Sequence, residues 1–197
     1  MAALETEFTI FCPAYPANGR TVFKGYLFAG DVLLNESGMQ DHPLTPMTDP
    51  NLVRVLRRQT KTKVGLVDHQ TVGRGTEAVQ QAFEGLKAAG IRMAVVDALN
   101  EADLMTIGAA ANGMAMVTGG SGIAIGLPKN FEIANGVADQ LPKIKGLSAV
   151  ISGSCSQATQ GQVANFMRNH PAFQIQPLEL AAGQDSAAAA LEWALHK

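Results

Sequence analysis

The 197 residues of this chain, of which 47% are hydrophobic and 16% charged, are enough for one α/β domain or two small ones with a sizeable core. A net charge of −2 without a long basic block argues against nucleic acid as a partner. No apolar stretch is long enough to span a bilayer, no secretory signal begins the chain, and Cys12 and Cys155 fit no metal or redox spacing. We therefore expect a cytoplasmic protein with free thiols, without a metal site and without membrane contact.

The first sixty residues favour short strands, loops and one helix. Residues 8–11 alternate and are rich in strand-forming side chains, and residues 14–19 form a loop of prolines, asparagine and glycine. Residues 21–28 predict a strand or a hairpin arm that is broken by a glycine. Residues 42–50 carry three prolines and predict a loop, and the last of these prolines begins a helix that is predicted over 50–59.

From residue 63 onward, strand patterns and helix patterns alternate. The predicted strands are 64–67, 93–96 and 115–117, and the predicted helical segments are 76–89, 101–111 and 123–128. Such alternation predicts an α/β fold with a mainly parallel sheet and helices on both faces.

A domain boundary is predicted near residue 140. Residues 135–146 are polar, contain two glycines and a proline, and lack periodicity, so we interpret them as a linker between residues 1–134 and 147–197. The second part predicts strands at 147–151 and 172–175 and helices at 157–167 and 187–195. It has too little core to fold alone, so we expect it to be the truncated start of a larger domain.

The turn Ser152-Gly153-Ser154-Cys155-Ser156 is the strongest candidate for a ligand site. The start of the following helix leaves backbone N–H groups unpaired and carries a partial positive charge, and small side chains let a phosphate approach them. Ser154 or Ser156 can add a hydroxyl donor and cap the helix. The alternative is an ordinary strand–helix connection with a serine cap. Cys155 has no histidine near it in sequence and is interpreted as a small turn residue.

A second glycine-rich turn lies at residues 119–122, and residues 120–126 resemble a dinucleotide-binding turn. The next predicted strand ends in Ser152-Gly153, without the acid that holds a ribose, so a nicotinamide cofactor is disfavoured. The turn can still bind a small anion through its N–H groups. The alternative is a tight turn that packs a helix against the sheet. The P-loop and nucleophile-elbow motifs are both absent from the sequence.

Two charged residues are further candidates. Arg20 follows a loop that prolines make rigid, and its guanidinium can clamp a carboxylate or phosphate; the alternative is an ordinary surface arginine. Asp97 ends a predicted strand, where open α/β sheets place their ligands; the alternative is a helix cap with Glu101 or Asp103. Asp68-His69 also follows a strand, and we rank it below Asp97.

As a set, these motifs resemble the four-carbon acid sugar kinases, from Leu4 to about Trp193. The similarity is greatest to members that phosphorylate 3-oxo-tetronates. The proline–glycine–arginine loop and the Ser-Gly-Ser-Cys-Ser turn are specific when they occur together in this order. The matching segments are residues 11–21, 25–28, 43–49, 96–99, 117–124, 152–160 and Gln162.

The resemblance implies a two-domain kinase that transfers the γ-phosphoryl group of ATP, with Mg²⁺, to the terminal hydroxyl of a four-carbon sugar acid. A 3-oxo-tetronate would give its 4-phosphate. The partners implied are the sugar acid and ATP, and oligomerisation stays open. The resemblance places Arg20, Asp97, Gly120 and Ser121 in the substrate domain, and Gly153 and Ser154 at ATP.

Two family motifs have no counterpart in this sequence. One is Asp-Asp-x-Thr-Gly, near the expected catalytic base, and the other is Gly-Gly-Glu-Thr, which belongs to the ATP site. We therefore expect residues 1–134 to be the C-terminal part of the substrate domain and the base to lie in a missing N-terminal segment. Since phosphoryl transfer needs several parts at once, we expect the chain alone to be inactive. The alternative function is a non-catalytic remnant that binds a small acid or a partner protein.

Overall fold

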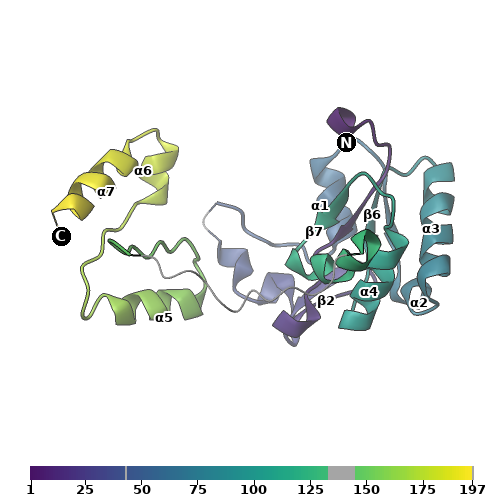
Figure 1. The fold of residues 1–197 in the computed structure, drawn as a ribbon, viewed down its shortest axis with the longest axis horizontal. Coiled ribbons are helices and arrows are strands. Elements are labelled where there is room, and N and C mark those ends of the chain that lie inside the picture. Colours follow the sequence, from purple (N-terminus) through teal and green to yellow (C-terminus); the bar gives the residue numbers. More distant parts are fainter. Residues whose placement is uncertain (43, 133–144, 197) are drawn as a thin grey trace. The chain divides into compact units, whose positions relative to one another are not determined.

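The computed structural model describes residues 1–42, 44–132 and 145–196. The chain divides into two compact units, Met1–Lys143 and Ile144–Lys197. Both are drawn in Figure 1, and each is described by itself. The predicted linker at 135–146 falls mostly on residues 133–144, which lie outside the described part.

The first unit is built on a sheet of four parallel strands. Ile10 lies on a central strand and pairs in parallel with Ala94 on one side and with Val117 on the other, and Val64 pairs in parallel with Met93. Every neighbouring pair in the sheet is therefore parallel. Ile10, Val95 and Val96 are completely buried, as expected for strands that are covered on both faces. The order is β5 (Val64–Val67), β6 (Met93–Val96), β1 (Thr9–Cys12) and β7 (Val117–Gly119).

Helices cover both faces of this sheet. Helix α1 (Leu52–Gln59) packs on β5 and β6 from one side, while α3 (Thr76–Ala88) and α4 (Glu101–Ala110) pack together on the other, beside α2 (His69–Val72) (Figure 1). The connections β5–α3–β6 and β6–α4–β7 progress in the same direction, and right-handed crossovers then place both helices on one face. The predicted α/β class, with a mainly parallel sheet and helices on both faces, is confirmed.

A small antiparallel sheet is attached to the main one. Its strands are β2 (Arg20–Phe23), β3 (Tyr26–Ala29) and β4 (Val32–Leu33). Lys24 and Gly25 form the turn between β2 and β3 with φ angles of 51° and 76°, as a type I′ hairpin turn requires. The predicted break at Gly25 is therefore a hairpin turn.

Several elements differ from the prediction. Strand β7 lies two residues later than predicted, and the segment after it is a 3₁₀ helix, η5 (Ser121–Gly126). Close backbone packing of the glycines in this segment is the physical reason. Helix α2 was not predicted, because four residues are too few for a periodic pattern. The remaining 3₁₀ segments are η1 (Ala2–Leu4), η2 (Pro16–Asn18), η3 (Leu34–Glu36), η4 (Met39–Asp41) and η6 (Pro128–Phe131).

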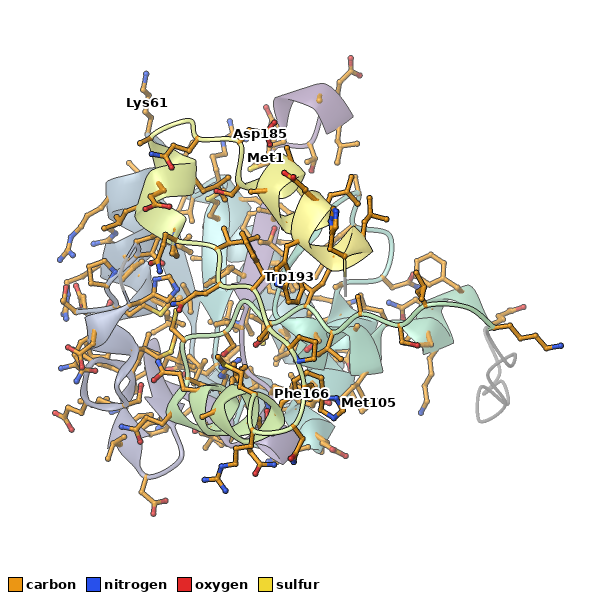
Figure 2. All side chains as sticks on the ribbon, turned by 90° about the vertical axis from the view of Figure 1, so that its left-hand side faces the viewer. Met1, Lys61, Met105, Phe166, Asp185 and Trp193 are labelled. Atoms are coloured by element: carbon orange, nitrogen blue, oxygen red, sulfur yellow. The ribbon has the colours of Figure 1, made fainter. Side chains whose placement is uncertain are left out.

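The second unit contains α5 (Gln157–Phe166), α6 (Pro177–Ala181) and α7 (Ser186–Leu195), and residues 145–196 contain no strand. The predicted strands at 147–151 and 172–175 are wrong for this structure. Backbone groups of a strand need a neighbouring strand, and the described part of this unit offers none. No residue from 145 to 196 is buried, and large apolar side chains such as Phe166 on α5 lie exposed (Figure 2).

None of the helices in the described ranges combines the length and the apolar composition needed to cross a membrane.

Candidate functional site

The carboxyl ends of the four parallel strands meet at one edge of the first unit. Residues after β5, β6, β1 and β7 therefore share this carboxyl edge. The chain leaves β1 toward α1 on one face, whereas it leaves β6 toward α4 on the other. Neighbouring strands with opposite connections mark the place where open α/β sheets bind ligands. This place lies between β1 and β6.

Strand β2 runs along the carboxyl edge. At its beginning, Arg20 exchanges two backbone hydrogen bonds with Tyr15, of 2.7 and 3.0 Å, in the loop after β1. Further along, Val22 exchanges two with Ala98, of 2.9 and 3.0 Å, directly after β6. Asp97 also follows β6, and Gly120 follows β7. The structure thus brings Arg20, Asp97 and the Gly120-Ser121 turn to the same edge of one sheet.

Arg20 is exposed at this edge. Its backbone is fixed by Tyr15, and the preceding Gly19 has a φ of 68°, which closes the tight turn into β2. Among the residues that the structure describes, no carboxylate or other acceptor pairs with the guanidinium of Arg20. An unpaired guanidinium on a fixed strand is suited to bidentate binding of a carboxylate or phosphate.

Asp97 is completely buried and accepts hydrogen bonds from three backbone N–H groups. Oδ2 accepts from Lys24 at 2.6 Å and from His69 at 3.0 Å, and Oδ1 accepts from Gly25 at 2.8 Å. Burial raises the pKa of the Asp97 carboxyl, and the three N–H groups oppose this shift. We call this arrangement the Asp97 clamp. It joins the β2–β3 turn and the start of α2 to the end of β6.

The capping role considered for Asp97 belongs to other residues. Asn100 Oδ1 accepts from the backbone N–H of Asp103 at 2.9 Å, and Asp103 Oδ2 accepts from that of Asn100 at 3.2 Å, which forms a capping box for α4. Asp103 Oδ2 also accepts from Leu99 at 2.7 Å and lies 3.5 Å from His69 Nε2. Asp68-His69, which the sequence ranks below Asp97, follows β5, and Asp68 caps α2 while His69 begins it.

The glycine-rich turn after β7 packs tightly against its neighbours. A Cβ atom on Gly119 would collide with the carbonyl oxygen of Cys12, and one on Gly122 with that of Ala14. The N–H of Gly120 donates to the Cys12 carbonyl at 3.2 Å. The glycines therefore allow the close approach that the packing interpretation anticipated. The same approach brings exposed Ser121 beside the loop that leads to Arg20.

Asp49 ties the segment before α1 to that helix. Its carboxylate binds Arg54 at 2.7 Å and Arg58 at 2.8 Å, and the hydrogen bond from Arg54 lowers the pKa of Asp49 to about 2. Arg54 also lies over the ring of Tyr26 on β3, with 5.7 Å to the centroid. These contacts support the hairpin from the side of α1.

Replacing Asp49 with asparagine is expected to lower the free energy of unfolding by about 0.5–1 kcal/mol at pH 7, because both ion pairs are lost. The loss is small because both arginine side chains are largely exposed to solvent. The folded-state pKa of about 2 lies below the ordinary value of 3.8, so this stability is present above the ordinary value and disappears as pH falls between the two. Urea unfolding of both proteins at pH 7 and near pH 2 measures the difference. A difference that persists at the lower pH would contradict this assignment.

The serine-rich turn belongs to the second unit, so Gly153 and Ser154 are in a different unit from the carboxyl-edge residues. Ser156 caps α5, since its Oγ accepts from the N–H of Thr159 at 3.2 Å. The hydroxyl of Ser154 accepts from the N–H of Ser156 at 3.2 Å. Both serines and Gly153 are exposed. Of the two capping candidates, the structure therefore selects Ser156.

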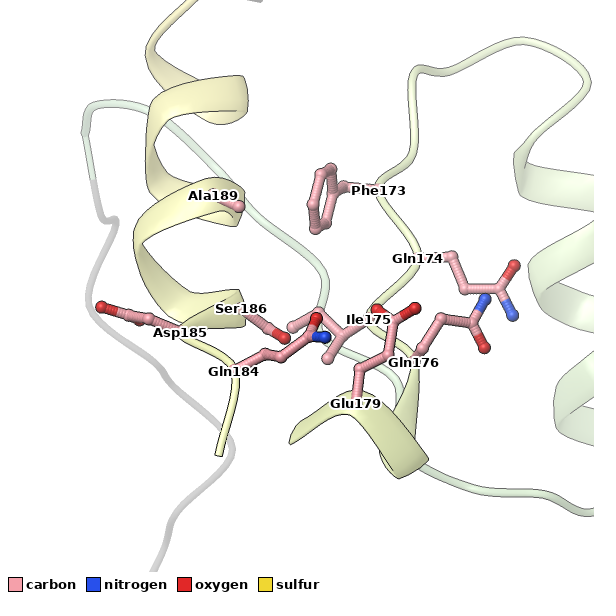
Figure 3. Close-up of a pocket in the computed structure, with 9 residues that line it drawn as sticks. All are labelled: Phe173, Gln174, Ile175, Gln176, Glu179, Gln184, Asp185, Ser186 and Ala189. Carbon is pink, nitrogen blue, oxygen red and sulfur yellow. The ribbon is translucent and has the colours of Figure 1, made fainter. Parts of the chain in front are cut away.

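Neither of two cavities coincides with the predicted site residues. One, of about 260 Å³, lies between the segment before α6 and the start of α7, where Phe173 and Ile175 face Ser186 and Ala189 (Figure 3). Its lining contains two carboxylates, of Glu179 and Asp185, and the side-chain amides of glutamines, but no lysine or arginine. The pocket therefore does not suit a phosphate.

The other cavity, of about 690 Å³, lies at the amino edge of the sheet, opposite the carboxyl edge. Its two cations are already paired, Arg92 with Glu7 at 2.7 Å and Lys87 with Glu84 at 2.7 Å. The carboxyl edge, with unpaired Arg20, is therefore the better candidate for binding an acid.

An open parallel sheet with an exposed, unpaired arginine at its carboxyl edge is an arrangement found in α/β ligand-binding domains. Residues 1–127 match the family described as the sugar-binding N-terminal domain, and the chain belongs to this family. It is 52% identical to a 3-oxo-tetronate kinase of Cupriavidus necator over 98% of this chain and 46% of that protein. The predicted resemblance to four-carbon acid sugar kinases is confirmed, and the chain spans about half the length of the curated relatives it matches.

Solved structures agree with this fold. A Haemophilus influenzae protein, 39% identical, superposes with a TM-score of 0.69 and covers 99% of this chain and 47% of its own. A domain from Bordetella bronchiseptica, 27% identical, superposes with a TM-score of 0.53 over 64% of this chain and 30% of its own. That domain was solved with bound citrate as a domain-swapped dimer.

Proposed function

We propose that the first unit binds a four-carbon sugar acid, as part of a kinase that phosphorylates it on the terminal hydroxyl. The observation that carries this proposal is the unpaired guanidinium of Arg20 at the carboxyl edge of a sugar-binding family fold. The relatives named 3-oxo-tetronate kinase support the substrate class and the reaction. The citrate in the Bordetella domain supports a site for carboxylates.

The roles of the edge residues follow from their free hydrogen-bonding groups. We assign the carboxylate or phosphate of the substrate to Arg20, and a second contact to the hydroxyl of Ser121, which follows Gly120 in the turn; the N–H of Gly120 itself donates to the Cys12 carbonyl. Asp97 was predicted as a substrate ligand, but its oxygens already accept hydrogen bonds from three backbone N–H groups. We propose that Asp97 acts indirectly, by holding the hairpin on which Arg20 lies.

For the second unit we propose the start of a nucleotide-binding domain, with Gly153 and Ser154 near the phosphates of ATP. The N-terminus of the ten-residue helix α5 carries a partial positive charge, which favours an anion. No group of three or more histidine, cysteine or acidic side chains in the described ranges could hold a metal. Mg²⁺ would therefore enter with ATP, where it neutralises charge on the phosphates.

We further propose that these 197 residues bind the acid without transferring a phosphoryl group on their own. The first unit has its own buried core, whereas residues 145–196 have none. Binding without catalysis is also what the alternative function, a small-acid-binding remnant, would give. Phosphorylation of a tetronate by the purified chain would overturn this proposal.

Calorimetric titration of the chain with erythronate and threonate tests the proposed acid site. Replacing Arg20 with alanine is expected to weaken binding about 10- to 100-fold, because charge-assisted hydrogen bonds are lost. Arg92→Ala is the matched control, since it removes the same charge at the opposite edge of the sheet. Equal affinities of Arg20→Ala and wild type, or binding lost only in Arg92→Ala, would rule out Arg20 as the anion ligand.

A further inference from the structure

The tripeptide Ala-Asn-Gly occurs at both edges of the main sheet. Residues 17–19 lie in the loop after β1, at the carboxyl edge, and residues 111–113 lie in the turn between α4 and β7, at the amino edge. A third copy, residues 134–136, lies outside the described residues. In both described copies the asparagine and the glycine are exposed to solvent. The two sites share their residues and their access to water, so the structure around each decides how it reacts.

An asparagine that is followed by glycine can lose its side-chain amide without an enzyme. The backbone nitrogen of the glycine gives up its proton and attacks the side-chain carbonyl carbon of the asparagine. A new N–C bond forms, the C–N bond of the side-chain amide breaks, and the amide nitrogen takes up the proton and leaves as ammonia. Water then opens the resulting five-membered succinimide and gives aspartate or isoaspartate. Glycine favours the attack because it has no Cβ to crowd the ring.

The backbone nitrogen of Gly113 is free for this attack. The N–H of Met114 donates to the carbonyl of Ala111 at 3.0 Å, and the N–H of Asn112 donates to that of Ala109 at 3.2 Å. The bond that closes a β-turn joins its first and fourth residues and leaves the N–H of the third unused. Within the described ranges, the N–H of Gly113 accordingly donates to no acceptor. A Cβ at Gly113 would meet no heavy atom within 4 Å, so the space around this turn is open.

The backbone nitrogen of Gly19 is held in place. Its N–H donates to the carbonyl of Pro16 at 2.9 Å, which closes the 3₁₀ helix η2. The carbonyl of Gly19 accepts from the N–H of Gly30 at 2.7 Å. Attack on Asn18 needs the Gly19 nitrogen to lose its proton and to turn toward the side chain, so one or both of these hydrogen bonds must break first. The loop that precedes Arg20 is therefore protected from the reaction.

We propose that Asn112 is a site of spontaneous deamidation, and that the hydrogen bonds of Gly19 protect Asn18 from the same reaction. This inference does not depend on the proposed function. The product carboxylate would line the amino-edge cavity, to which Asn112 belongs, and would make the net charge of −2 more negative by one. Isoaspartate would also lengthen the main chain between α4 and β7 by one carbon atom.

Tandem mass spectrometry of tryptic digests, taken while the purified chain is incubated in mildly alkaline buffer, measures both rates in one sample. Cleavage after Arg20, Arg92 and Lys129 places Asn18 and Asn112 in different peptides. We expect Asn18 to react about five- to thirtyfold more slowly than Asn112, the range set by breaking one or two neutral hydrogen bonds. Asn18 therefore serves as the internal control for Asn112.

The chain unfolded in guanidinium chloride is the second control, because it keeps both tripeptides and removes their hydrogen bonds. We expect the two rates to become similar there. In Asn112→Gln, ring closure would need a six-membered ring, so conversion at this position should stop while the rate at Asn18 stays unchanged. Equal rates in the folded chain, a faster reaction at Asn18, no conversion at Asn112 in the folded chain, or a rate difference that persists after unfolding would each overturn the inference.

Discussion

Replacing Asp97 with alanine is expected to lower the free energy of unfolding of the first unit by about 3 kcal/mol, because three backbone N–H groups lose a buried acceptor. Asp97→Asn should cost less, about 1–2 kcal/mol, since one amide oxygen at the position of Oδ2 still accepts from Lys24 and His69. Urea unfolding, followed by a probe of the first unit, measures both values. Asp31→Ala removes an exposed carboxylate from the β3–β4 turn and should change stability by less than about 0.5 kcal/mol.

The pH dependence of the Asp97 variants provides a second test. Burial raises the folded-state pKa of Asp97, so the folded protein binds this proton more tightly than the unfolded chain does. The stability of wild type relative to Asp97→Asn should therefore fall as pH rises from the ordinary value of 3.8 through the raised one. A loss below about 1 kcal/mol for Asp97→Ala would show that the clamp does not hold the hairpin.

Replacing Gly122 with alanine is expected to destabilise the first unit by about 2–3 kcal/mol, because the added methyl group would meet backbone atoms of Ala14 and Tyr15 that cannot move freely. The loop that fixes Arg20 should shift as well, so binding of erythronate should weaken in the same variant. Thermal melting and calorimetry measure the two effects.

Gly85→Ala is the matched control for this variant, and it should have the opposite sign. Gly85 lies inside α3, and its added Cβ would meet no heavy atom within 4 Å. Alanine there should raise stability by up to about 1 kcal/mol. If Gly122→Ala were as stable as wild type, the tight packing of the turn after β7 would be refuted.

The sequence was sufficient for the elements of the first unit whose patterns are local. Helix α3 and strands β5 and β6 follow from hydrophobic patterns, and Gly25 marked the break at which the structure has a hairpin turn. Strand β7 and helix η5 were misplaced because their geometry depends on glycine contacts with distant backbone, which no local pattern reports. In the second unit, apolar runs such as 147–151 have the composition of strands but no strand beside them to pair with.

The candidate site could be located from sequence more readily than its contacts. Parallel strands bring residues such as Asp97 and Gly120 to one edge, and this follows from strand order and direction. The partners of Asp97 do not, since Lys24 and Gly25 lie 73 and 72 residues earlier in the chain. For the same reason, the contact of His69 with Asp103 could not be read from spacing. The assignments of Arg20, Gly120, Ser121, Gly153 and Ser154 to ligands remain predictions.

The central claim is that the carboxyl edge of the first unit binds the sugar acid. Amide NMR spectra of the chain, recorded while erythronate or threonate is added, test it most directly because they report where the ligand contacts the protein. We predict that the signals of Arg20, Gly120 and Ser121 shift together and saturate. Shifts confined to the amino-edge cavity around Arg92, or to the pocket around Phe173 in the second unit, would contradict the account.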